Sequence, residues 1–283
     1  MDYVVPAEVA RKMVIAGSGK AQLRPSEVLV RGILSGALLG VSTSLALTAT
    51  LQTQKPIVGA LIFPVGFVMI VVLGLELVTG NFALVPLARI QGTATTAEVL
   101  GNLVWAFAGN LLGSVGYAVL LSLVLTGFGH QSATGIAPLI VSAAEAKTLG
   151  YAGLGATGLA TSFVKAILCN WLVCFGVIMG MTSSSTLSKI AAAWLPIFMF
   201  FAQGFEHSVV NMFLIPAGMM LGAKVSLAQW WLWNQIPVTL GNVVGGFLLT
   251  GLPLYYTYYR QAEIKTMEPQ VVAEQAVGQE VPA

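Results

Sequence analysis

Long stretches without a charged side chain are the feature that most restricts how this chain can fold. Asp, Glu, Lys and Arg are absent from runs such as 32–54, 99–144, 166–188 and 225–259. A helix needs about 20 apolar residues to cross the hydrocarbon core of a bilayer, and these runs are long enough. Only 8% of the 283 residues are charged and the mean hydropathy is +0.85, values far from those of a soluble domain. The sequence therefore predicts an integral membrane protein.

The apolar runs are continuous and much longer than the roughly 10 residues of a membrane β-strand, so we expect an all-α membrane fold rather than a β-barrel. Six transmembrane helices are predicted, the second and fifth of them broken near Gly74 to Asn81 and near Gly204 to Asn211. Their ranges are 28–52, 57–92, 98–126, 157–181, 187–222 and 228–258.

The positions of Lys and Arg predict the orientation. One side of the membrane would carry Arg11, Lys12, Lys20, Arg24, Arg31, Arg89, Lys189, Arg260 and Lys265, and the other only Lys55, Lys147 and Lys224. Both termini are therefore expected in the cytoplasm, for a multi-pass protein of a bacterial-type inner membrane.

Three regions follow from this pattern. Residues 1–26 resemble an interfacial amphipathic helix rather than a cleaved signal peptide. Residues 27–258 form the transmembrane domain. Residues 259–283 are polar and are expected to form a flexible cytoplasmic tail.

An internal repeat relates the two halves of the transmembrane domain. GLELVTGN at Gly74 matches GFEHSVVN at Gly204, with glycine, glutamate and asparagine at the same offsets. Segments before and after these breaks repeat in the same order: VRGIL at Val30 with VKAIL at Val164, and GNLLG at Gly109 with GNVVG at Gly241. We interpret residues 28–126 and 157–258 as two copies of one unit.

Each copy has three spans, so the second copy enters the membrane from the opposite side and the repeats are inverted. Interrupted helices at matching positions of two repeats indicate a transport site, because unwound backbone at membrane depth requires protein or a polar cavity to satisfy it. The two breaks are expected to meet near the middle of the membrane.

Glu206 and His207 lie inside an apolar span, where a charge costs roughly 2.5–3.5 kcal/mol on the insertion scale. Lys165 is the predicted partner of Glu206. The alternative for Lys165 is a helix end whose ammonium reaches the headgroups. Glu76 has no cation nearby in sequence, so we expect it to accept backbone N–H groups.

His207 has a side chain that can donate a hydrogen bond or a proton to an anion near neutral pH. The alternative is a neutral histidine bonded within the core. Thr79, from the first break, and Asn170, from the fourth span, are its predicted hydrogen-bond partners. Leu77 fills the position of His207 in the first copy, which makes His207 the expected functional residue.

Other site types find little support. Cys169 and Cys174 are about 140° apart around one helix and are expected to pack rather than form a disulfide or bind a metal. The sequence has no HExxH, GxSxG or phosphate-binding loop, so we expect no enzyme, cofactor, metal or nucleic-acid partner. Large apolar side chains near the breaks are candidates for constrictions that exclude hydrated ions: Phe63, Phe67, Leu77, Val173, Phe200 and Phe205.

The motifs GLELVTGN, AILCNWLVC and GFEHSVVNMFLIP together resemble the signatures of the formate/nitrite transporter family, over roughly residues 6–258. The resemblance implies a homopentamer in the lipid bilayer whose protomers have an aquaporin-like fold, each with its own pore. It also implies Leu77 and Thr79 in the loop of the first break, Phe63 and Phe67 in a cytoplasmic constriction, and Phe200 and Val173 in a periplasmic one. His207 would lie between the constrictions, and Lys165, Glu206 and Asn211 would support it.

The expected function is passage of small monovalent weak-acid anions, formate or nitrite first, with proton donation by His207. Hydrosulfide, lactate or bicarbonate-like anions are the alternative substrates. A neutral-solute channel of aquaporin type is opposed by the absence of an NPA pair. A membrane enzyme with His207 as base lacks a nucleophile, and a scaffold would not need polar groups at matched breaks.

Overall fold

The computed structural model describes residues 2–261, and the regular secondary structure in this range is helical, apart from one isolated β-bridge between Tyr3 and Ser183. The predicted tail at 259–283 lies almost wholly outside the described residues. This all-α architecture agrees with the expected fold class.

Within residues 2–261, four helices are long and apolar enough to cross a membrane. They are α2 (Pro25–Thr53), α6 (Thr96–Leu125), α9 (Ala156–Met179) and a final helical run, Leu227–Tyr259. That run is divided into α12 (Leu227–Trp230), η1 (Trp231–Gln235), α13 (Ile236–Val243), η2 (Val244–Gly251), α14 (Leu252–Leu254) and η3 (Tyr255–Tyr259). Their bounds lie within three residues of the predicted first, third, fourth and sixth spans.

Shorter helices occupy the two segments in which breaks are predicted. The first contains α3 (Pro56–Ile62), α4 (Pro64–Val72) and α5 (Val78–Ile90), and the second contains α10 (Thr186–Ala202) and α11 (Ser208–Met220). The chain leaves the helical conformation between α4 and α5 and again between α10 and α11. Gly74 and Gly204 both have φ of +64° there, a conformation that favours glycine.

Three further helices lie outside these spans: α1 (Pro6–Ala21), α7 (Ala137–Ala146) and α8 (Leu149–Gly153). Helix α1 packs on α5, with Val9 and Met13 against Leu84 and Leu87. Helix α7 packs on α11 in the same way, with Ile140 against Phe213 and Ala217. The helix α7 is thus the counterpart of α1 in the second half, a relation not apparent in the sequence.

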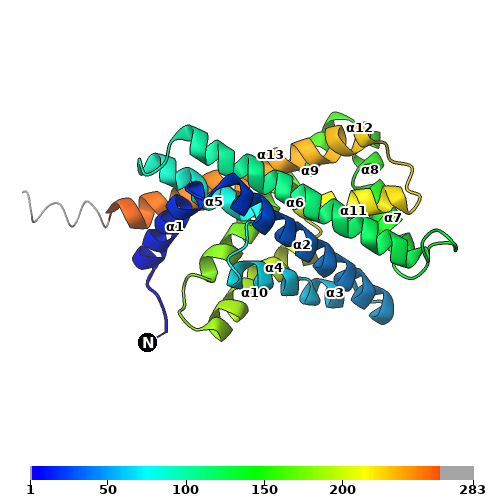
Figure 1. The fold of residues 1–283 in the computed structure, drawn as a ribbon, viewed down its shortest axis with the longest axis horizontal. Coiled ribbons are helices and arrows are strands. Elements are labelled where there is room, and N and C mark those ends of the chain that lie inside the picture. The colour runs from blue at the N-terminus through cyan, green and yellow to red at the C-terminus, as the bar shows by residue number, and fades with distance from the viewer. Residues whose placement is uncertain (1, 262–283) are drawn as a thin grey trace, which may run out of the picture.

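Figure 1 shows how these elements are arranged. Helix α1 and the last helix of the described chain lie together at one end of the elongated molecule, and α7, α8 and α12 lie at the opposite end. Helices α2 and α6 run beside each other between the two ends. The two half-length helices α5 and α11 therefore approach the interior from opposite ends.

Small residues determine how closely the long helices pack. A Cβ atom added to Gly36 would lie 2.1 Å from the carbonyl oxygen of Asn110, and one added to Gly113 would lie 1.9 Å from that of Ile33. Helices α2 and α6 approach this closely because glycine leaves backbone against backbone, as in other membrane helix pairs. This contact fixes Asn110, which holds the first break, relative to α2.

We expect Gly113→Ala to destabilise the protein by about 1–3 kcal/mol, because the added methyl group meets backbone that cannot move aside. The thermal unfolding midpoint in detergent measures the effect. Gly116→Ala, on the same helix with no atom within 4 Å of the added methyl group, is the control and should leave the midpoint unchanged. Equal midpoints for the two variants would contradict the close packing of α2 on α6.

Candidate functional site

An asparagine holds the backbone of the first break. The Asn110 side chain, fully buried on α6, accepts the N–H of Val78 at 2.9 Å. Its amide donates to the carbonyl oxygens of Glu76 at 2.8 Å and of Gly32 at 2.9 Å. One side chain therefore forms hydrogen bonds with backbone groups at the start of α5, in the unwound segment before α5, and in α2.

The second break repeats this arrangement. The Asn242 side chain on α13 accepts the N–H of Ser208 at 2.9 Å and donates to the carbonyl oxygens of Glu206 at 3.0 Å and Ala166 at 2.8 Å. The Glu206 N–H in turn donates to the Lys165 carbonyl oxygen at 3.4 Å. Asn110 and Asn242 are the asparagines that the sequence repeat aligns, so they perform the same task in each half.

A buried carboxylate lies beside the first break, in a set that we call the Glu76 group: Lys20, Glu76, Asn81 and Asn102. The Lys20 ammonium is 2.7 Å from Glu76 Oε1, and the Asn81 amide donates to Glu76 Oε2 at 2.7 Å. Asn81 also donates to Asn102 Oδ1 at 2.8 Å, and Asn102 donates to the Lys20 carbonyl oxygen at 2.8 Å. Both oxygens of a carboxylate that is 1% exposed thus have partners.

The Glu206 group, defined as Lys147, Glu206, Asn211 and Asn234, has the same connections. Lys147 is 2.8 Å and the Asn211 amide 2.7 Å from Glu206 Oε2. Asn211 donates to Asn234 Oδ1 at 2.9 Å, and Asn234 donates to the Lys147 carbonyl oxygen at 3.0 Å. In addition, the Tyr151 hydroxyl donates to Glu206 Oε1 at 2.7 Å.

Two sequence-based pairings are therefore wrong. Glu206 is paired with Lys147 at the end of α7, whereas Lys165 contributes only its backbone oxygen. Glu76 is paired with Lys20 rather than with backbone N–H groups. In both halves the lysine comes from a helix that packs on the half-length helix, a tertiary contact for which the sequence gives no local signal.

The residues that sequence reasoning missed are Lys20, Lys147, Asn102, Asn234 and Tyr151. A signal existed for the two asparagines, since Asn102 precedes Asn110 by the same eight positions that separate Asn234 from Asn242. Extending the repeat comparison in the N-terminal direction would have found them. The lysines lie outside the matched motifs and have no such signal.

His207 lies directly before α11 and is 2% exposed. Its Nδ1 accepts the N–H of Val210 at 3.2 Å, so the neutral ring carries its proton on Nε2. Nε2 is 3.1 Å from the Thr79 hydroxyl of the first break, which is the contact expected between them. This joins the two breaks through side chains that are able to donate hydrogen bonds.

Asn170 was expected to form a hydrogen bond with His207, and this prediction is wrong. Its amide donates instead to the backbone oxygens of Thr79 at 3.0 Å and Asn242 at 2.6 Å. The Cys174 thiol lies 3.3 Å from the same Thr79 oxygen. Asn170 thus fixes the backbone on which Thr79 is held, and neither cysteine forms a disulfide.

Aromatic side chains surround His207. The Phe200 ring stacks on the His207 ring with centroids 5.7 Å apart, and Phe63 meets Phe200 edge-on at 5.6 Å. Val173 belongs to the same buried cluster. Phe63 and Phe67, expected to share a constriction, both belong to this cluster as well, and the assignment of these side chains to separate constrictions stays a prediction.

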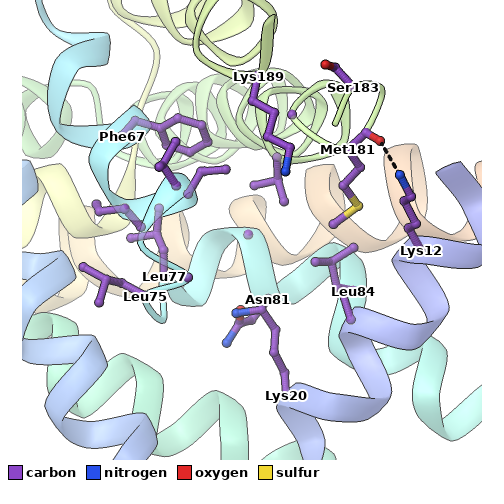
Figure 2. A pocket seen from close by; sticks show the side chains of 18 of the residues that line it. Lys12, Lys20, Phe67, Leu75, Leu77, Asn81, Leu84, Met181, Ser183 and Lys189 are labelled. Atoms are coloured by element: carbon purple, nitrogen blue, oxygen red, sulfur yellow. Dashed lines mark hydrogen bonds between the residues drawn. The ribbon is translucent and has the colours of Figure 1, made fainter. Parts of the chain in front are cut away.

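A cavity of about 490 Å³ adjoins this buried cluster, and Phe67 and Leu77 belong to both. Its apolar walls include Phe67, Leu75 and Leu77, and Lys12, Lys20 and Lys189 provide its charge (Figure 2). Lys12 and Lys20 come from α1 and Lys189 from α10, and all three line a common space, where positive potential favours anions. The Glu76 group lies at this cavity, since Lys20 and Asn81 both line it.

The N-terminal residues are attached near the rim of the cavity. Asp2 accepts hydrogen bonds from the Ser183 hydroxyl at 2.6 Å and from the N–H groups of Ser184 and Ser185 at 2.9 Å. These hydrogen bonds, the one from the Ser183 hydroxyl most of all and then the one from the Ser185 N–H, hold the pKa of the Asp2 carboxyl well below its usual range. The segment before α1 is thereby tied to the connection between α9 and α10.

Comparison with known proteins gives consistent matches. A family model described as "Formate/nitrite transporter" matches residues 7–256. A "Probable formate transporter" of Methanothermobacter thermautotrophicus is 35% identical over 274 residues, which cover 90% of this chain and 97% of that protein. A solved structure titled "FNT family ion channel" has a TM-score of 0.74 at 27% identity and covers 88% of this chain and 98% of its own. One titled "Pentameric formate channel with formate bound" has the same fold, with a TM-score of 0.68 at 24% identity, over 83% of this chain and 97% of its own.

We expect Lys147→Met to destabilise the protein by about 3 kcal/mol, because it leaves the Glu206 carboxylate buried without its cation. Lys165→Met should stay within about 0.5 kcal/mol of the unaltered protein. Thermal unfolding in detergent compares the two variants. A larger loss of stability for Lys165→Met than for Lys147→Met would support the pairing of Glu206 with Lys165 and contradict its pairing with Lys147.

Proposed function

Since the chain belongs to the formate/nitrite transporter family, we propose that it carries formate or nitrite through a passage within each protomer, past His207. Proteins of this family are channels and transporters for small monovalent anions rather than enzymes. The relative from Methanothermobacter thermautotrophicus, 35% identical to this chain, is described as a probable formate transporter. The choice of formate or nitrite for this chain follows from that likeness.

The single observation that carries the proposal is the position of His207. It is a buried polar side chain where the first break has Leu77, and its Nε2 faces the Thr79 hydroxyl at 3.1 Å. The bond from Val210 to Nδ1 leaves Nε2 as the donor. A small anion that replaces Thr79 as acceptor would receive a hydrogen bond from this nitrogen.

Apolar side chains on both sides of His207 supply the barrier. Phe63 and Phe200 cover one side, and Leu77 and Phe67 face the cavity on the other. A free anion would lose its hydration there at a cost of several kcal/mol. Hydrogen-bond or proton donation by His207 lowers this cost, because a charge-compensated or neutral acid crosses an apolar constriction more easily.

Lysines attract the anion toward both ends of this passage. Lys12, Lys20 and Lys189 act in the cavity, and Lys147 acts at the opposite end of the molecule. Lys147 takes the role that the sequence had assigned to Lys165. Like Lys20, which is 22% exposed, Lys147 is 21% exposed, so both ammonium groups remain accessible to solvent while paired.

The membrane topology that we propose has six spans. The long helices provide four, and α4 with α5 and α10 with α11 each make one interrupted span, in an aquaporin-like arrangement of inverted repeats. Both ends of the described chain lie at the end of the molecule that holds α1. The excess of Lys and Arg there favours a cytoplasmic location for both termini, in an inner membrane.

Replacement of His207 tests the proposal. In proteoliposomes, we expect His207→Phe to reduce formate and nitrite flux about 100-fold or more, because general acid donation contributes roughly 10²–10⁴-fold to a rate. The remaining flux should no longer rise as the pH is lowered. His130→Phe replaces the other histidine, on the exposed loop after α6, and should leave flux unchanged. Wild-type flux and pH dependence in His207→Phe would remove His207 from the mechanism.

We also propose a homopentamer, on the basis of the pentameric neighbour and the apolar residues exposed on α6, among them Leu100, Val104, Leu112 and Leu120. Native mass spectrometry from detergent should give a complex of five 29.6 kDa chains. A monomer that conducts anions at the same rate per chain would contradict the pentamer as the functional unit.

A further inference from the structure

The Glu206 carboxylate has two donors with no counterpart at Glu76: a long bond from the Asn234 amide to Oε2 at 3.5 Å and a short one from a phenol. The Tyr151 hydroxyl is 2.7 Å from Glu206 Oε1, and none of the hydrogen bonds of the Glu76 carboxylate within residues 2–261 comes from a phenol. Tyr151 is 7% exposed and Glu206 is 1% exposed, so the contact is shielded from water. A phenol that donates to a buried carboxylate makes a short, strong hydrogen bond.

The phenol donor comes from an insertion between corresponding helices. Residues 22–24 connect α1 to α2, whereas residues 147–155 connect α7 to α9 and contain α8, on which Tyr151 lies. This short helix packs closely on α9, since a Cβ on Gly158 would lie 1.9 Å from the Tyr151 backbone oxygen. The phenol is therefore held in place rather than mobile.

Tyr151 changes how the lysine meets the carboxylate. In the first half Lys20 contacts Oε1 of Glu76 and Asn81 contacts Oε2, so each donor has its own oxygen. In the second half the phenol occupies Oε1, and Lys147 shares Oε2 with Asn211 and, at 3.5 Å, with Asn234. The phenol takes up part of the carboxylate charge, so the Lys147 ammonium is less fully compensated and attracts external anions more strongly.

We propose that Tyr151 is a positioning residue that sets the affinity for the transported anion at the Lys147 end of the passage, by holding Oε1 of Glu206 away from Lys147. The inference rests on the proposed transport function. It assigns different affinities to the two ends of a passage whose supporting polar groups are otherwise matched. Tyr151 acts through Glu206 and Lys147 and does not itself contact the anion.

The test measures each end of the passage separately. Right-side-out and inside-out membrane vesicles from the same cells expose opposite ends, and initial rates of formate or nitrite uptake give KM and maximal rate for each. We expect Tyr151→Phe to raise KM about three- to ten-fold in one vesicle type, the range for loss of one hydrogen bond. KM in the other vesicle type and both maximal rates should change less than about twofold.

Tyr117→Phe is the matched control. Its hydroxyl also has one polar partner, Ser44 Oγ at 2.7 Å, but it lies outside both polar groups. This variant should leave both KM values unchanged. Because phenylalanine keeps the ring that packs α8, Tyr151→Phe should reach the membrane at wild-type amounts, and the ratio of the two KM values does not depend on the amount of protein.

Three results would overturn the inference. An equal change of KM in both vesicle types would show a general structural effect, and no change in either would show that the phenol has no influence on binding. A wild-type protein that transports neither anion in either vesicle type would overturn the proposed function and this inference together. Wild-type transport with an unchanged KM ratio in Tyr151→Phe overturns the role of Tyr151 alone.

Discussion

A helix that stops inside a membrane leaves backbone N–H and C=O groups that no water can satisfy, and each unpaired buried group costs about 1–3 kcal/mol. Asn110 and Asn242 meet this constraint in the same way, with one oxygen that accepts the first N–H of a half-length helix and one amide that donates to two backbone oxygens. The rest of the site depends on this arrangement. It holds Thr79 and His207 on unwound or newly started backbone, where they can meet across the interior.

The same frame carries different chemistry in its two halves. Leu77 precedes α5 and lines the cavity, while His207 precedes α11 and presents Nε2 to Thr79. The supporting lysine, glutamate and two asparagines are of the same residue types in both halves, and the exchange of Leu77 for His207 replaces an apolar wall by a hydrogen-bond donor. Tyr151 is the other difference, and it acts on the carboxylate rather than at the centre.

Sequence reasoning succeeded where the information was local. Charge-free runs predicted the long helices within three residues, and the repeated glycine, glutamate and asparagine located both interruptions and identified Thr79 as a neighbour of His207. It failed for the partners of Glu76 and Glu206, because Lys20 and Lys147 reach them from α1 and α7, over separations of 56 and 59 residues.

The central claim is that the transported anion meets Nε2 of His207 between the two breaks. A cryo-electron microscopy structure in lipid nanodiscs, with formate or nitrite present, tests it most directly. We expect anion density roughly 3 Å from His207 Nε2, within each protomer, where the Thr79 hydroxyl accepts in the unliganded protein. Density confined to the axis between protomers, with the contact between His207 and Thr79 intact, would contradict it.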